Sequence, residues 1–578
     1  MGIERYSGLS YGRPMNRRMI PALDAAAIRA MTVRLVACRS VSPDIAGETK
    51  CAREIESMLA PALERGAWKT PDGRTVVWAL APGSTPTTVV LMGHYDTVGV
   101  GEFGALGDPA GEAVAFDPAA LRARLLVRLA SGAPLFSAEQ AADLGEERDS
   151  PGTWLFGRGA LDMKSGVAIG IAVVNAWAAH STPPRCGVLF IATPDEENES
   201  AGMVAALAGL RRLRERRGLE LEGALNLDTV HERAAYLGAM GKIELGCYVV
   251  GRPTHAGAPL LGVDAAEFAA GIVTRVTRTP AMIDEDATGE VRSVPPVALR
   301  LRDLKDTYNI QTAIEAWVEF NLITVSRPLA ETLECLRAEV MKALDELLES
   351  HRRLAAWLSP DDADRTPNVD PATCVLTYAE LCERAGLAPG DDPLTAPGAA
   401  GAHAATIADR RGRAEATARV AAPDPRAATL ARLRELSRRA GLGGPAVVLF
   451  LLPPFYPHVA PGEGPLVRAT REALAGERDV PVKPYYPLVS DACYAAWRAE
   501  PLTEVARQMP SLGREYTLPY DDARALDLDV VNLGPWGHDL HGLLERAHAG
   551  WTFEQCPRLV WNVLERMCEF ASPGGATP

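Results

Sequence analysis

Residues 87–96 read TTVVLMGHYD, an apolar run that ends at Gly93 and is followed by a histidine and an aspartate two positions apart. A continuous apolar run of this length is typical of a strand that is buried on both faces. His94 and Asp96 would then lie at the carboxyl end of that strand, either as a metal ligand with its supporting carboxylate or as an ordinary polar loop. The pair alone is compatible with both interpretations, so the rest of the chain decides between them.

Several other apolar runs have the same form and alternate with helix-like segments. They are CGVLFIAT (186–193), GALNLD (223–228), AVVLFLLP (446–453) and DVVNLG (529–534). Helices are predicted between them, over 164–180 and 203–217. Strands that alternate with helices predict an α/β/α sandwich, in which helices cover both faces of one sheet.

The segment from 240 to 350 has a different pattern. Strands are predicted over 242–251, 297–306 and 316–326, and helices over 265–278 and 328–350. The order β-α-β-β-α suits a small ferredoxin-like α+β domain. Because the α/β pattern resumes near residue 445, we expect this domain to be inserted into the larger one.

We therefore expect three parts. Residues 1–239 form the first part of the catalytic α/β domain, 240–350 an inserted lid or dimerisation-like domain, and 351–578 the second part of the catalytic domain. Residues around 390–430 are rich in Ala, Gly, Pro and Arg, which predicts a flexible insertion. Residues 101–150 also have the character of an insertion, whose role the sequence leaves open.

The composition is that of an ordinary globular protein and argues against some classes of function. The 578 residues carry a formal net charge of −14, which argues against binding to the phosphates of nucleic acids. The ten cysteines include no C-x-x-C pair, as expected of reduced thiols in the cytoplasm. We also find no apolar segment typical of a signal peptide or a membrane span, so we expect a cytoplasmic protein without a membrane partner.

Acids and histidines follow five of the predicted strand ends and strand–helix junctions. They are His94 and Asp96, Asp162 in GRGALDMKSG (157–166), Asp195, Glu196 and Glu197 in TPDEENES, Asp228 in NLDTV, and His538, His541 and Glu545 in GPWGHDLHGLLE. Ligands of open α/β sheets bind beyond the carboxyl ends of the strands. Two histidines with several carboxylates suit zinc, and also manganese or cobalt. A carboxylate can bridge two such ions, while a further carboxylate takes the proton of the attacking water.

The H-x-D, GRGALDMKSG and DEE blocks, in this order, resemble the M20 family of metallopeptidases and amidohydrolases. GPWGHDLHGLLERAH (534–548) and LRDLKDTYNIQT (301–312) resemble the arginine-utilisation branch of that family. The resemblance implies a zinc-peptidase-like mixed sheet with a lid domain and two divalent metal ions, zinc being the expected metal. It also implies hydrolysis of an amide bond in a peptide or an N-acyl amino acid, in the catabolism of arginine or a related amino acid.

The resemblance implies a role for each residue that matches the motifs. His94 and Asp228 would hold one metal ion, Glu197 and His541 the other, and Asp162 would bridge them. Glu196 would be the general base, and Asp96 would orient His94. His541 is preferred to His538 because H-G-L-L-E matches the family's H-x-x-x-E spacing, and His538 remains the alternative.

Two further residues match motifs in the lid domain. GRPTHAGAP (251–259) implies that His255 stabilises the oxyanion of the reaction, and Asn309 resembles a substrate-binding asparagine. In dimeric relatives that histidine comes from the neighbouring subunit, so a homodimer is one implied arrangement. The D-x-R that exopeptidase relatives carry after the asparagine is replaced by EFNLITVSRP, in which Arg327 lies too far along. This departure argues against a substrate with a free α-carboxylate in the usual place.

Several alternatives stay open. Asp162 and Asp195 could each cap a helix, and Asp491 in VSDACY could approach the site. The rival function is a catalytically degenerate member of the M20 fold that binds or scaffolds, although the complete ligand set argues against it. Hydrolysis of an ester or carbamoyl group is a second rival. The chain carries neither G-x-S-x-G nor a phosphate-binding P-loop, which argues against those two enzyme classes.

Overall fold

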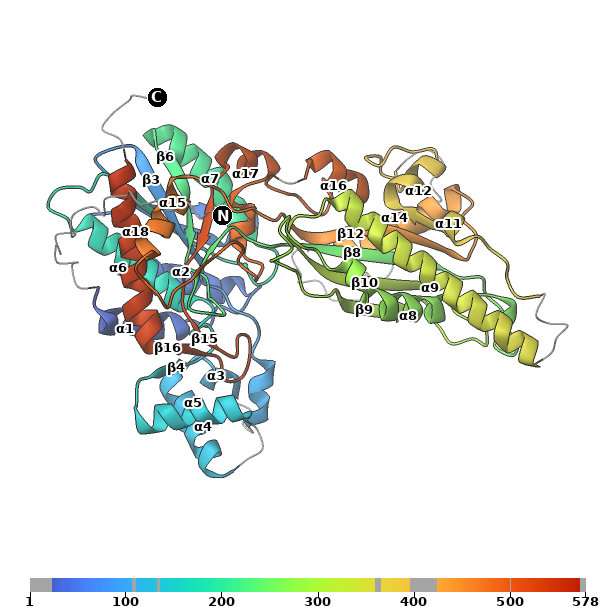
Figure 1. The fold of residues 1–578 in the computed structure, drawn as a ribbon, viewed down its shortest axis with the longest axis horizontal. Coiled ribbons are helices and arrows are strands. Elements are labelled where there is room, and N and C mark those ends of the chain that lie inside the picture. Colours follow the sequence, from blue (N-terminus) through green and yellow to red (C-terminus); the bar gives the residue numbers. More distant parts are fainter. Residues whose placement is uncertain are drawn as a thin grey trace, which may run out of the picture.

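The structure is a computed structural model that describes residues 23–106, 111–132, 136–358, 365–395, 424–498 and 500–571. Two helix-covered sheets lie next to each other along the long axis of the molecule (Figure 1). The fold is the predicted α/β domain with an inserted lid domain.

The first sheet has eight strands within the described ranges, in the order β1-β2-β5-β3-β6-β14-β7-β13. Their bounds are β1 Glu64–Lys69, β2 Thr75–Ala81, β3 Thr87–His94, β5 Gly187–Thr193, β6 Glu220–Asn226, β7 Ala235–Leu237, β13 Val482–Lys483 and β14 Val530–Asn532. β3 runs parallel to both β5 and β6, and β14 runs parallel to β6. The carboxyl ends of these four strands therefore lie at one edge of the sheet.

Helices cover both faces of this sheet. On one face lie α1 (Ala25–Val36), α2 (Ile45–Met58), α6 (Lys164–Ala178), α15 (Pro465–Leu474) and α18 (Cys556–Phe570), and on the other lies α7 (Ala201–Arg217), next to α17 (Tyr520–Leu526). α6 is apolar nearly all round, and a helix of that kind is stable only when it is buried. This explains why α6 lies at the centre of the core.

The second sheet has the order β11-β12-β8-β10-β9. The bounds are β8 Gly241–Val250, β9 Val297–Asp303, β10 Glu315–Thr324, β11 Val375–Thr377 and β12 Ala446–Tyr456. α8 (Ala265–Val276) and the long α9 (Leu329–Leu358) pack on one face, and α12 (Tyr378–Arg384) and α14 (Pro425–Arg439) on the other. Side chains alternate between the two faces, so Cys247 joins the first set of helices and Tyr248 the second.

β12 corrects one prediction. The chain does not return to the main sheet at residue 446, because β12 pairs antiparallel with β8 and parallel with β11. An apolar run such as AVVLFLLP is buried on both faces in either sheet, since helices cover both sheets, so composition alone could not assign it. The predicted flexible insertion around 390–430 falls largely on residues 396–423, which lie outside the described residues.

The described residues between 101 and 149 (101–106, 111–132 and 136–149) form a small helical unit. It consists of η1 (Gly101–Leu106), α3 (Gly111–Val114), α4 (Pro118–Ala130) and α5 (Ala138–Asp149). Phe103, Leu121 and Leu144 belong to its apolar core. The unit lies against a short sheet formed by β15 (Gly537–His538), β16 (Arg546–His548) and β4 (Trp154–Phe156) (Figure 1).

The remaining elements are short. They are η2 (Pro259–Leu261), η3 (Pro280–Met282), α11 (Pro371–Cys374), η4 (Asp491–Ala495), α16 (Leu502–Gln508) and η5 (Gly550–Gln555). Among the residues that the structure describes, no helix combines the length and the apolar character that a membrane span requires.

Candidate metal centre

Side chains from five separate segments converge beyond the carboxyl ends of the central strands. His94 ends β3, Glu196 and Glu197 follow β5, and Asp228 follows β6. Three groups have donor atoms within 4.8 Å of one another: His94–Asp162–Asp228, Asp162–Glu197–His541, and His94–Glu196–Glu197. The structure thus brings together all five predicted metal ligands and the predicted base, which we call the metal cluster.

Asp162 lies between the two histidines. Its Oδ1 is 3.0 Å from Nε2 of His94, and its Oδ2 is 3.0 Å from Nε2 of His541. Nε2 of His541 is also 3.1 Å from Oε1 of Glu197. The N-cap position of α6 is occupied by Met163, so the alternative reading of Asp162 as the cap of that helix is wrong.

The two candidate histidines in the last motif have different surroundings. His541 belongs to the metal cluster, whereas Nδ1 of His538 is 2.8 Å from Oδ2 of Asp143 in α5. The H-x-x-x-E spacing therefore selects the histidine that lies beside the other predicted ligands.

The metal cluster holds an excess of carboxylates away from water. Burial, with the charge of Asp162, raises the pKa of Asp228 to about 8, and burial also raises the pKa values of Glu196 and Glu197. Burial lowers the pKa of His541, but the hydrogen bonds and negative charges of Asp162 and Glu197 together outweigh burial and raise this pKa to about 10. Carboxylates that retain protons and an imidazole that gains one both indicate a place where positive charge is favoured.

The donor set fits two divalent cations. Imidazole nitrogens and carboxylate oxygens are the ligands that zinc, manganese and cobalt share in proteins. Two of the three groups have Asp162 as their only common member, which is the arrangement a bridging carboxylate requires. Buried carboxylates that repel one another are costly unless cations neutralise them.

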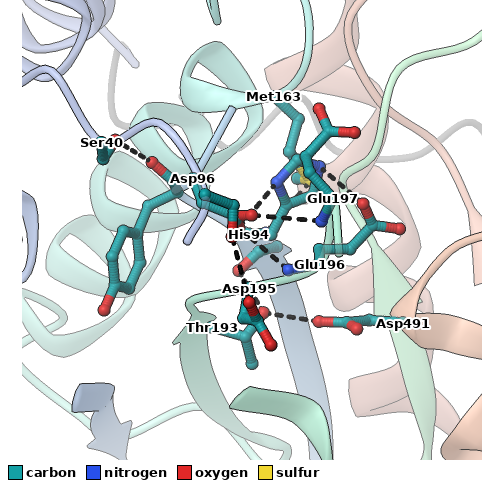
Figure 2. A network of polar contacts seen from close by, with 12 residues as sticks. Ser40, His94, Asp96, Met163, Thr193, Asp195, Glu196, Glu197 and Asp491 are labelled. Carbon is teal, nitrogen blue, oxygen red and sulfur yellow. Dashed lines mark hydrogen bonds and ion pairs between the residues drawn. The ribbon is translucent and has the colours of Figure 1, made fainter. Parts of the chain in front are cut away.

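Asp96 binds the loop that carries the two glutamates. Its Oδ1 accepts a hydrogen bond from the backbone NH of Glu196 and its Oδ2 one from that of Glu197, both at 3.1 Å. Oδ1 also lies 3.4 Å from Nδ1 of His94 (Figure 2). Asp96 therefore links the ends of β3 and β5, in addition to facing the imidazole that it was expected to orient.

Asp195 holds the same loop from the other side. It has a left-handed backbone conformation (φ 69°), and its carboxylate accepts hydrogen bonds from Oγ of Ser42 (3.0 Å) and from the backbone NH of Ala201 (3.1 Å), the first residue of α7. The same carboxylate forms a buried ion pair with Arg74, which also lies beside Glu48. The N-cap position of α7 is occupied by Ser200, so Asp195 is not the cap residue, but it accepts the hydrogen bond of the first backbone NH of that helix and anchors the loop directly before Glu196.

Glu545, which the sequence placed among the acids near the site without a ligand role, and Arg158, which sequence reasoning missed, link the Asp162 loop to the His541 loop. Oε1 of Glu545 accepts hydrogen bonds from the backbone NH groups of Leu161 (3.1 Å) and Asp162 (3.2 Å). Arg158 donates to Oε2 of Glu545 (2.5 Å) and to the backbone carbonyl of His541 (2.9 Å). The signal that could have revealed Arg158 is its charge within the GRGALDMKSG block, where the fold buries it.

Asp491 approaches the metal cluster, as its position in the sequence suggested. It is buried and accepts a hydrogen bond from Oγ1 of Thr193 at 2.7 Å (Figure 2). Burial raises its pKa to about 7. Asp491 also influences Glu196: burial is the main cause of the raised pKa of Glu196, and the negative charge of Asp491 raises it further.

His255 and Asn309 lie in two adjacent loops at the far end of β8. The backbone NH of Ala256 donates to the carbonyl of Ile310 at 2.9 Å, and both predicted side chains are exposed. β8 starts four residues after β7 of the main sheet, and its ten residues span about 30 Å before these loops. Within the described part of one chain, the structure does not bring His255 or Asn309 to the metal cluster.

Comparison with known proteins identifies the family. The profile of Peptidase family M20/M25/M40 matches residues 141–514. The uncharacterized protein YqjN of Bacillus subtilis is 28% identical over 521 residues, which cover 87% of this chain and 88% of YqjN. Protein RocB of the same organism is 26% identical over 596 aligned positions, which cover 96% of each chain.

The aminopeptidase PepT of Bacillus cereus superimposes with a TM-score of 0.49 at 13% sequence identity, covering 94% of this chain and 99% of that one. The match to Protein RocB agrees with the branch that the sequence motifs indicated. As its motifs predicted, the chain belongs to the M20/M25/M40 peptidase family of metal-dependent hydrolases.

Proposed function

We propose that the protein cleaves an amide bond, in a peptide or an N-acyl amino acid, with the help of two divalent metal ions. The observation that carries the proposal is the position of Asp162 between His94 and His541. Zinc is the expected metal, and manganese or cobalt fit the same donors. When bound, the ions would lower the pKa of a water molecule and polarise the carbonyl of the substrate.

The grouping of donor atoms supports a division of the ligands. His94 and Asp228 would hold one ion, and Glu197 and His541 the other. These pairs fall into separate groups that have only Asp162 in common, which supports a bridging role for that carboxylate.

Glu196 is our candidate for the general base. Its Oε2 lies 3.8 Å from Nε2 of His94, and its side chain is only 10% exposed. Burial raises its pKa, so the carboxylate is suited to accept a proton from the attacking water. The carboxylate would then transfer this proton to the leaving nitrogen as the C–N bond breaks, which yields a carboxylic acid and an amine.

A second copy of the chain would supply His255 and Asn309. The edge strand of the lid sheet, β9, supports this arrangement because it exposes Val297, Leu299 and Leu301 by 51%, 51% and 46%. An apolar edge strand is a template for pairing with another chain.

A mixing experiment tests this part of the proposal. Glu196→Gln and His255→Ala chains would each be inactive, and their mixture would regain part of the activity if the histidine acts in the neighbouring subunit. No recovery, with subunit exchange demonstrated, would show that His255 acts within its own chain or not at all.

For the substrate we propose an acylated amino acid or an arginine-derived amide that is processed in the cytoplasm. The resemblance to the arginine-utilisation branch supports this class, and the missing D-x-R motif argues against a free α-carboxylate in the usual place. All ten cysteines lie within the described ranges and are free thiols, which is compatible with a reducing compartment.

A substrate panel tests the proposed reaction. N-acyl amino acids, arginine derivatives, dipeptides and matched esters would be incubated with the wild type and with Glu196→Gln. We expect hydrolysis of at least one amide, and a loss of about 10²- to 10⁴-fold in the variant. Undiminished hydrolysis by Glu196→Gln would contradict the assigned base, and turnover of esters alone would contradict the assigned bond.

A further inference from the structure

The helical unit at residues 101–149 contacts the loop that carries His541 through polar side chains at both of its ends. From α5, Oδ2 of Asp143 accepts hydrogen bonds from Nδ1 of His538 and Nε of Arg546, both at 2.8 Å. Nε2 of Gln140 donates to Oδ1 of Asp539 at 3.0 Å. Arg546 is fully buried and also forms an ion pair with Asp539, so the five side chains form one network.

The other end of the unit acts through Arg158. Glu102 of η1 forms an ion pair with this arginine, and the ring of Phe103 lies 5.7 Å from its guanidinium carbon. Arg158 in turn donates to the backbone carbonyl of His541 at 2.9 Å. The unit therefore holds the His541 loop from both sides.

This loop needs external support. Asp539 and His541 both have left-handed backbone conformations, with φ values of 57° and 59°. Such a conformation is strained for a residue with a side chain and persists only where the surroundings enforce it. The side chain of His541 is 44% exposed, compared with 2% for His94, so the core of the protein does little to fix it.

We propose that the inserted helical unit at 101–149 is a positioning element for the metal site. It holds the loop at residues 538–546 so that the imidazole of His541 faces Asp162 and Glu197. The inference rests on the proposed function, because it assigns the unit an effect on metal binding. The effect is confined to the ion that Glu197 and His541 would hold, since His94 and Asp228 are placed by β3 and β6 of the main sheet.

Metal affinity is the direct test. Zinc affinity of both sites would be measured by competition with a chromophoric chelator, and the cobalt-loaded protein would be followed by its visible absorption. Asp143→Asn removes the negative charge that accepts hydrogen bonds from His538 and Arg546. In Gln140→Glu, a side-chain oxygen can still accept the hydrogen bond from the backbone NH of Ser137, the N-cap of α5. The donor to Asp539, however, is replaced by a carboxylate oxygen that repels it. Asp149→Asn is the matched control, because this residue of the same helix is exposed and pairs with its neighbour Arg148.

We expect both variants to bind one zinc ion about 10- to 100-fold more weakly and the other as the wild type does. The control should bind both ions as the wild type does. If Asp143→Asn does not fold, Gln140→Glu alone decides. Unchanged affinities, or an equal loss at both sites, would overturn the inference. A wild type that binds no metal would overturn the proposed function and this inference with it, whereas a wild type with two ions and unaltered variants would overturn the inference alone.

Discussion

Arg74 and Asp195 form a buried ion pair directly before the two glutamates of the metal cluster. Their side chains are only 6% and 1% exposed, and they come from segments 121 residues apart. The pair connects the β1–β2 hairpin to the loop between β5 and α7, and it holds this loop in place.

Removal of the cation from this pair should be costly. In Arg74→Met, the Asp195 carboxylate stays buried without a counter-charge, so we expect the free energy of unfolding to fall by about 3–5 kcal/mol. Arg34→Met is the control, because the pair of Arg34 with Glu54 is 54% and 30% exposed and should contribute less than about 1 kcal/mol. Equal losses in denaturant titrations of the two variants would contradict this account of Arg74.

Glu48 predicts a specific dependence of stability on pH. Burial, assisted by the charge of Asp96, raises its pKa to about 8. Between about pH 4 and pH 8 the folded state therefore retains a proton that the unfolded state has released, and the free energy of unfolding of the wild type falls as the pH rises, by at most about 5 kcal/mol from this group. Glu48→Gln stays neutral at every pH.

The stability of this variant relative to the wild type should therefore increase with pH and level off above about 8. Denaturation of both proteins at a series of pH values measures this difference. A difference that does not vary with pH would show that Glu48 is ionised in the folded state throughout.

Asp96 should affect metal affinity because its carboxylate holds the backbone NH groups of Glu196 and Glu197. In Asp96→Asn one oxygen becomes an amide group, which cannot accept the hydrogen bond of Glu196 or Glu197, and we expect metal affinity to fall about 10- to 100-fold. Asp44→Asn is a suitable control because Asp44 caps α2, where asparagine caps equally well. Chelator competition measures both variants, and wild-type affinity in Asp96→Asn would refute this role.

The two histidines of the last motif should behave differently. His541→Ala removes a donor that faces Asp162 and Glu197, so at saturating zinc we expect one ion per chain in place of two. His538→Ala should retain two ions, because this side chain faces Asp143. The reverse result, measured by elemental analysis after gel filtration, would assign the ligand role to His538.

The metal cluster could be predicted from the sequence because its members follow strand ends. Parallel strands such as β3, β5 and β6 bring their carboxyl ends to one edge, so His94, Glu197 and Asp228 had to lie near one another once the sheet was recognised. Their spacing within short motifs then pointed to a family with a known arrangement of ligands.

The supporting residues could not be predicted in the same way. Arg158 reaches Glu545 across 387 positions, and Asp143 reaches Arg546 across 403, and nothing in the local sequence pairs such residues. The placement of β12 failed for a related reason, since an apolar run indicates burial without indicating the sheet. His255 and Asn309 match motifs, but their exposed loops lie at the far end of the lid, and the role that we propose for them requires a second chain.

The most direct test of the account is the number of metal ions per chain. Elemental analysis would be applied to wild-type protein purified without chelator, before and after incubation with zinc, manganese or cobalt, with Asp162→Ala as the comparison. We predict about two ions per chain in the wild type and their loss in the variant, because Asp162 would bridge both ions. A wild type that binds close to zero ions per chain with every metal supplied would contradict this proposal and favour a catalytically degenerate member of the family.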